Sequence, residues 1–140
     1  MTNLKFKKIL IVEDDVDILF SLEMLLENEG YTVQVAENGA VALELIKNNG
    51  LPNLILLDMM MPVMNGWQFG LKVHALYGHL CPIVVMTAAA DAQQRAKDIN
   101  AIDWLEKPFN FKKLLTLIKK HVNADENIAE NLNQAIIQLK

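Results

Sequence analysis

Short apolar runs alternate with amphipathic stretches along the chain. The runs have the length of β-strands, and in the stretches between them apolar residues recur at helical spacing. The predicted strands are Ile9–Val12, Tyr31–Ala36, Leu54–Leu57, Ile83–Met86 and Ile102–Leu105. The predicted helices are Val16–Glu29, Val41–Ile46, Gly66–Leu76, Asp91–Asp98 and Phe111–Val122.

This order of elements predicts an α/β fold with a doubly wound, five-stranded parallel sheet and right-handed crossovers. Leu54–Leu57 is uniformly apolar, as expected of a strand that helices cover on both faces. Ligands of such sheets bind at the carboxyl ends of the strands. The residues that directly follow the predicted strands should therefore share one edge: Glu13, Asp14, Asp58, Thr87 and Lys107.

Acidic residues stand out at two of these strand ends. Asp58 directly follows Leu54–Leu57, and Glu13-Asp14-Asp15 follows Ile9–Val12. Side by side, the two groups would form a pocket of negative charge that favours a divalent cation, and Asp58 could accept a phosphoryl group. Taken without Asp58, the three acids could simply be a solvated turn, and Asp15 is predicted to cap the first helix.

Composition narrows the class of protein further. With 140 residues, 52% hydrophobic and 21% charged, the chain suits one globular domain. A net charge of -4 argues against a nucleic-acid surface. No apolar run approaches the roughly 20 residues of a membrane span, and the N-terminus lacks a signal-peptide pattern. The single cysteine, Cys81, cannot form an internal disulfide, which fits a cytoplasmic protein.

Taken in order, these motifs resemble the receiver domain of two-component response regulators, in particular chemotaxis-regulator-like receivers. The resemblance covers roughly Lys7 to Val122 and implies a flavodoxin-like sheet of strand order 2-1-3-4-5 flanked by five helices. The matching motifs are Glu13-Asp14, Asp58 with Met61-Pro62 and Asn65-Gly66, Ala36-Glu37-Asn38-Gly39, Thr87-Ala88, and Lys107-Pro108-Phe109.

The resemblance implies that Asp58 is the phosphoacceptor and that Mg²⁺ is the cofactor. The implied metal ligands are Asp14, Asp58 and the backbone carbonyl of Met60, with Glu13 acting through a bound water. Magnesium's preference for oxygen ligands fits this set.

The resemblance also implies a phosphoryl-binding set and a switch. The Thr87 hydroxyl, the Lys107 ammonium and the Ala88 backbone N–H would each contact a phosphoryl oxygen. Thr87 and Trp104 would form the switch, although the family usually carries tyrosine or phenylalanine in place of Trp104. A Trp104 packed statically on the last helix is the alternative. The Lys107-Pro108 bond is expected to be cis.

Two further expectations concern the lifetime of the phosphoryl group and the backbone conformation at Asn100. Met60 and Ala89 lie two residues after Asp58 and Thr87, and neither holds a hydrolytic water well, so a phosphoryl lifetime of minutes or more is our hypothesis. Asn100 stands where the family usually carries glycine and is expected to keep a left-handed turn.

We therefore interpret the chain as a phosphoprotein of a two-component system, which takes its phosphoryl group from a histidine kinase or a histidine phosphotransfer protein. It would catalyse only its own phosphorylation and dephosphorylation. The residues contain no recognisable DNA-binding or catalytic output module, so the expected output is contact with a downstream protein, without nucleic-acid binding or membrane insertion. A homodimer through the fourth helix, fifth strand and fifth helix, or through the tail, is a further option.

Three rival interpretations remain at this point. A phosphatase of the haloacid-dehalogenase type also uses an aspartate after a strand, but it carries a second acid where this chain has Met60. A receiver-like scaffold would no longer take phosphate. The chain could also be a receiver excised from a hybrid kinase or multidomain regulator.

The predicted domain organisation is a receiver at residues 1–122 and a helical tail at 123–140. The tail has an apolar stripe at helical spacing, formed by Ile128, Leu132, Ala135, Ile136 and Leu139. It could fold back on the domain, fray in solution, bind a partner or a second copy, or begin an output domain.

Overall fold

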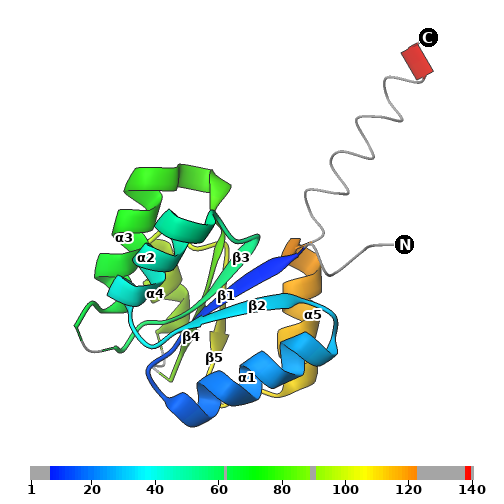
Figure 1. Ribbon diagram of the computed structural model, residues 1–140, viewed down its shortest axis with the longest axis horizontal. Coiled ribbons are helices and arrows are strands. Elements are labelled where there is room, and N and C mark those ends of the chain that lie inside the picture. Colours follow the sequence, from blue (N-terminus) through cyan, green and yellow to red (C-terminus); the bar gives the residue numbers. More distant parts are fainter. Residues whose placement is uncertain (1–6, 62, 89–90, 123–137, 140) are drawn as a thin grey trace. The chain divides into compact units, whose positions relative to one another are not determined.

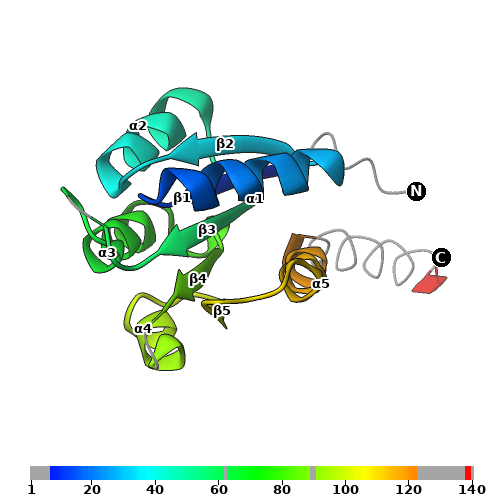
Figure 2. The same cartoon turned by 90° about the horizontal axis from the view of Figure 1, so that it is seen from below.

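The computed structural model describes residues 7–61, 63–88, 91–122 and 138–139. Its sheet contains five parallel strands in the order β2-β1-β3-β4-β5 (Figures 1 and 2), which confirms the predicted fold class. The strands are β1 (Lys8–Val12), β2 (Thr32–Ala36), β3 (Leu54–Asp58), β4 (Ile83–Thr87) and β5 (Asp103–Glu106).

The helices follow the strands as the sequence pattern predicts, with small shifts at their ends. They are α1 (Val16–Asn28), α2 (Gly39–Asn49), α3 (Gly66–Tyr77), α4 (Ala92–Asp98) and α5 (Phe111–Val122). The pattern missed a short 3₁₀ helix, η2 (Gly78–Leu80), because a single tight turn has no periodicity to detect. Asn100 has the predicted left-handed backbone, with φ of 57°.

Side chains from both faces of the sheet form the core. Every residue of β3 and β4 is buried, since α1 lies on one side of the sheet and α2, α3 and α4 lie on the other (Figure 1). On the second side, alternate strand residues such as Leu10 and Leu57 pack with Phe69 of α3. On the first side, α1 buries Leu19, Leu22 and Leu26, each worth roughly 2 kcal/mol.

Polar side chains start the helices directly after the strand ends. Asp15 accepts hydrogen bonds from the backbone N–H groups of Asp17 and Ile18, so its predicted role as the cap of α1 is confirmed. Asn65 and Gln68 form a reciprocal capping box at the start of α3. These caps define where the chain turns after β1 and β3, and they therefore position the acidic residues at the mouth of the sheet.

The chain divides into two compact units between Phe109 and Asn110. In the second unit, α5 is amphipathic and buries Leu114, Ile118 and Val122, which recur every fourth residue along one face. The tail predicted at 123–140 lies outside the described residues apart from 138–139, and the domain boundary at residue 122 stays a prediction. Among the described residues, no helix has the length and apolar character needed to cross a membrane.

Candidate functional site

The register of the sheet brings the candidate residues to one edge. Val12 is paired with Leu57, so Glu13 and Asp58 follow neighbouring positions on β1 and β3. Asp58 is paired with Met86, which directly precedes Thr87 at the end of β4. Parallel strands carry their carboxyl ends to the same side, which explains why residues far apart in the sequence meet here.

Three carboxylates form a cluster at this edge. Glu13, Asp14 and Asp58 each offer one oxygen, and these oxygens all lie within 4.8 Å of one another. Glu13 is 1% exposed and Asp58 is 5% exposed, whereas Asp14 reaches solvent. The cluster therefore gathers negative charge at the boundary between the protein interior and water.

Lys107 supplies the positive charge that faces the cluster. Its Nζ donates a hydrogen bond of 2.8 Å to Glu13 Oε2 and lies 3.8 Å from Asp58 Oδ1. Its backbone N–H donates to the Thr87 carbonyl at 2.8 Å, and the Lys107-Pro108 bond is cis, as expected. In the part of the chain that the structure describes, the Lys107 ammonium contacts Glu13 and Asp58 of this three-carboxylate cluster, so one positive charge offsets only part of the negative charge.

The electrostatics of the two buried acids reflect this imbalance. Burial, reinforced by the neighbouring Glu13 carboxylate, raises the pKa of Asp58 from 3.8 to about 7, against the opposing effects of Lys107 and of the Met60 N–H. Burial also raises the pKa of Glu13, although the hydrogen bond from Lys107 lowers it. Both shifts favour a further positive charge at this site, whether a proton or a cation.

The donor chemistry of the cluster fits Mg²⁺. All three side chains present carboxylate oxygens, the ligands that this hard cation prefers, and the exposed Asp14 leaves room for the waters that it retains. No histidine or cysteine belongs to the cluster among the described residues, which argues against a softer metal.

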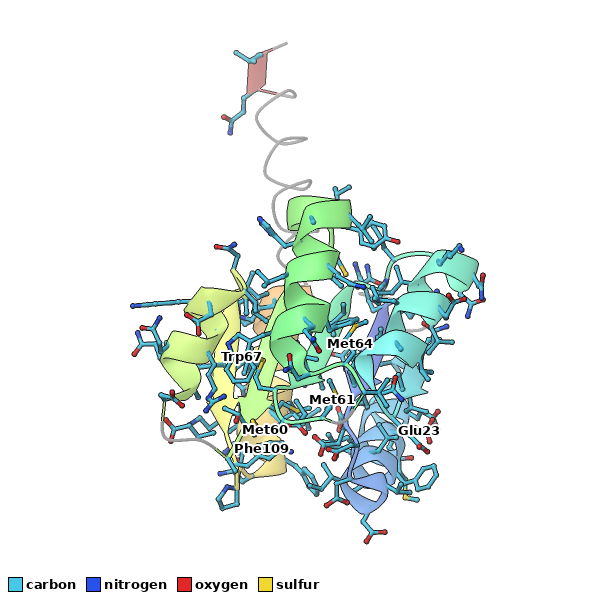
Figure 3. The ribbon with its side chains drawn as sticks, turned by 90° about the vertical axis from the view of Figure 1, so that its left-hand side faces the viewer. Glu23, Met60, Met61, Met64, Trp67 and Phe109 are labelled. Atoms are coloured by element: carbon cyan, nitrogen blue, oxygen red, sulfur yellow. The ribbon has the colours of Figure 1, made fainter. Side chains whose placement is uncertain are left out.

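A hollow opens beside the acids on the side of the loop that joins β3 to α3. It is lined by Asp14, Met59, Met60, Met61, Asn65 and Trp67. The Met60 backbone N–H lies 3.3 Å from Asp58 Oδ1, so this loop touches the candidate phosphoacceptor directly. Met59 and Met61 are buried, whereas the Met60 side chain is exposed, and Figure 3 shows Met60, Met61 and Trp67 around this loop.

The remaining candidate residues lie on β4 and β5. Thr87 is buried at the end of β4, and Ala88 follows it at the surface. Trp104 of β5 is 37% exposed. The phosphoryl contacts expected of Thr87 and Ala88 and the switch role expected of Trp104 stay predictions. Ala89, invoked for the phosphoryl lifetime, lies outside the described residues.

The sequence reasoning missed a group of side chains that joins α3 to α4. The Arg95 guanidinium stacks over the Trp67 ring at 4.6 Å, and Trp67 Nε1 donates to Asp98 Oδ2 at 3.2 Å. Arg95 Nε also donates to Asp91 Oδ1 at 2.7 Å. The i, i+4 spacing of Asp91 and Arg95 is a signal of pairing on a helix, but it does not indicate which aromatic residue on another helix they meet.

The chain is similar in sequence to known proteins. A family model described as the response regulator receiver domain matches residues 9–119. The chain is 33% identical over 132 residues to the transcriptional regulatory protein CpxR homolog of Haemophilus influenzae, covering 93% of this chain and 56% of that protein. More generally, the chain spans about half the length of the curated relatives it matches.

Solved structures show the same fold. The chemotaxis protein CheY4 of Vibrio cholerae has a TM-score of 0.75 and 31% identity, with 82% of this chain and 98% of that chain covered. The response regulator protein TrrA of Thermotoga maritima, solved in complex with Mg(2+)-BeF, has a TM-score of 0.74 and 30% identity, with 82% and 98% covered.

Proposed function

The chain belongs to the response regulator receiver domain family, and we propose that it accepts a phosphoryl group on Asp58 from a histidine kinase or a histidine phosphotransfer protein. Receivers of this family work with such kinases and with downstream targets. The proposal for this chain is which of its residues perform the phosphoryl transfer.

The surroundings of the Asp58 carboxylate are the main support for its proposed phosphorylation. The Asp58 carboxylate lies in a cluster with Glu13 and Asp14 while Lys107 Nζ stands 3.8 Å from its Oδ1. A buried carboxylate among other acids destabilises the fold unless a cation compensates its charge, because burial and like charge both oppose ionisation. Phosphoryl transfer uses these features, since it needs a carboxylate nucleophile and nearby positive charge.

In the proposed reaction, an Asp58 carboxylate oxygen attacks phosphorus. A new O–P bond forms while the bond from phosphorus to the donor's imidazole nitrogen, or to the oxygen of a small acyl phosphate, breaks and leaves its electron pair on the donor. Glu13 (through water), Asp14, Asp58 and the Met60 carbonyl would hold Mg²⁺, which offsets the negative charge of the phosphoryl oxygens when it is bound.

The other site residues would hold the phosphoryl group once it has been transferred. Lys107 would move its hydrogen bond from Glu13 to a phosphoryl oxygen, which is a stronger acceptor with more charge. The Thr87 hydroxyl and the Ala88 backbone N–H would contact the other oxygens. Because Thr87 and Trp104 lie on the neighbouring strands β4 and β5, these contacts would alter the surface around α4 and β5 and so change the affinity for a downstream protein.

Two rival functions have less support. Met60 occupies the position where a phosphatase of the haloacid-dehalogenase type carries its second acid, and its exposed thioether side chain offers no carboxylate there. We propose that the chain turns over no separate phosphoester substrate. A scaffold that takes no phosphate has no need for the close ammonium–carboxylate arrangement of Lys107 and Asp58.

The test is the intact mass after incubation with a small acyl phosphate, with and without Mg²⁺, for the wild type and Asp58→Asn. We expect one added phosphoryl mass that requires both Mg²⁺ and Asp58. Asp17→Asn is the matched control, because Asp17 is an exposed acid in the first turn of α1. Addition that persists in Asp58→Asn would disprove the assignment of the phosphoacceptor.

A second measurement concerns the metal and the phosphoryl-binding set. The TrrA structure contains Mg(2+)-BeF, and we expect the same reagents to raise the thermal stability of this chain more than Mg²⁺ alone. An equal effect on Asp58→Asn would show that the reagents act away from the proposed site.

A further inference from the structure

One guanidinium group on α4 touches two residues that line the hollow beside the acids. Arg95 stacks on the Trp67 ring at 4.6 Å, and its NH1 atom lies 3.9 Å from the Met60 sulfur. The Arg95 side chain is only 18% exposed although it lies at the surface. Arg95 thus contacts both Met60 and Trp67, which we call the outer wall.

The contacts around Arg95 restrict its own position. Asp91, one turn earlier on α4, accepts a hydrogen bond of 2.7 Å from Arg95 Nε. Asp98 accepts from Trp67 Nε1 at 3.2 Å and from Gln94 Nε2 at 3.0 Å, so the ring is held at its edge as well as on its face. A long arginine side chain held at several points loses little further entropy when it orders its neighbours.

Met60, one of the two residues of the outer wall, lies beside the candidate phosphoacceptor. Met60 donates its backbone N–H toward Asp58 Oδ1 at 3.3 Å, and its exposed side chain lines the same hollow as Asp14. A methionine side chain has three rotatable bonds and would sample many positions without a partner. The contact with Arg95 selects one of them.

We propose that Arg95 is a positioning residue that holds the outer wall in place and thereby limits the access of water and of small phosphodonors to Asp58. This inference rests on the proposed phosphorylation of Asp58. Loss of Arg95 frees Met60, so water reaches the aspartyl phosphate more readily and a small donor reaches the carboxylate more readily. Both loading and hydrolysis then become faster.

A purely electrostatic role for Arg95 predicts the opposite effect on loading. Acyl phosphates are anions, so removing a nearby positive charge would slow their approach to Asp58. The direction of the change in loading rate therefore separates positioning from attraction. Loss of the stacking and sulfur contacts should change the rates of loading and decay about fivefold.

The experiment measures loading by a small acyl phosphate with Mg²⁺, and the decay of the loaded protein after the donor is removed, both by intact mass. For Arg95→Gln we expect loading and decay to be about fivefold faster than in the wild type. Arg95→Lys keeps a cation over the ring and should return both rates most of the way to the wild-type values. Lys97→Gln removes an exposed charge from the same helix and should change neither rate.

A measurement that does not depend on phosphorylation reports on Met60 itself. The ¹³C-methyl signal of Met60, identified with Met60→Leu, should move and sharpen in Arg95→Gln and remain close to its wild-type position in Lys97→Gln. Unchanged or slower loading in Arg95→Gln, with the wild type loading normally, overturns the inference and leaves the proposed function intact. A wild type that gains no phosphoryl mass overturns both.

Discussion

The buried carboxylate of Asp58 should destabilise the fold at neutral pH in the absence of a cation. Its pKa rises from 3.8 to about 7 because burial and the Glu13 carboxylate disfavour its charged form. A raised pKa means that, between pH 3.8 and about 7, the folded state keeps a proton that the unfolded state has released. The contribution of Asp58 to the stability of the fold is therefore at its full value below pH 3.8, where its carboxyl group is protonated in both states. That contribution declines as the pH rises and is lost once the pH passes about 7.

The size of the effect follows from the two pKa values. The difference between 3.8 and about 7, at about 1.4 kcal/mol per pH unit, corresponds to about 4 kcal/mol. Asp58→Asn removes the charge and keeps an oxygen that accepts from the Met60 N–H. Because a buried amide also loses its water, we expect the variant to gain roughly 2 kcal/mol of unfolding free energy at pH 7.5.

The assay is urea unfolding in EDTA at pH 7.5 and at pH 4.5, for the wild type and the variant. The stabilisation by Asp58→Asn should be largest at pH 7.5 and should shrink toward zero at pH 4.5. Asp98→Asn is the control, and it should lower the free energy of unfolding at pH 7.5 rather than raise it. Hydrogen bonds from Gln94 and Trp67 favour the charged form of that exposed acid and lower its pKa. An Asp58→Asn variant that is no more stable than the wild type at pH 7.5 would refute the reasoning.

Three further substitutions test other parts of the structure by urea unfolding at neutral pH. Lys107→Met leaves the buried Glu13 carboxylate without its 2.8 Å partner and should cost about 3 kcal/mol, and no loss would show that the pair is solvated. Gly66→Ala places a Cβ 2.6 Å from the Met59 Cα and should cost about 2 kcal/mol, whereas a neutral result would mean that the loop yields easily. The Tyr31 hydroxyl is buried without a hydrogen-bond partner among the described residues, so Tyr31→Phe should gain about 1 kcal/mol, and a loss would reveal a partner.

Much of the fold was predictable because its signals are local. The apolar runs gave the strands within a residue or two, and the capping side chain of Asp15 marked the start of α1. The left-handed backbone at Asn100 was predictable from the residue type, but the positive φ of 67° at Val63 was not, since a β-branched residue disfavours it. The 3₁₀ helix η2 was also missed.

The site itself was predictable as a set of positions rather than as a set of contacts. The sequence placed acids, a threonine and a lysine after successive strands, because the alternation of strands and helices carries every strand end to one edge. It could not show that Met60 and Trp67 share Arg95, since that contact joins residues from a loop and two helices. Side-chain spacing along one helix does not encode the partner on another.

The sequence by itself determined the order of the elements, the side of each strand and helix that turns inward, and the residues that follow each strand, because all of these depend on near neighbours in the chain. Only the tertiary structure brought Lys107 to Glu13 across 94 positions and buried Asp58 among other acids. Burial and charge act through space, so the raised pKa of Asp58 and the contact of Arg95 with the outer wall exist only once the sheet has assembled.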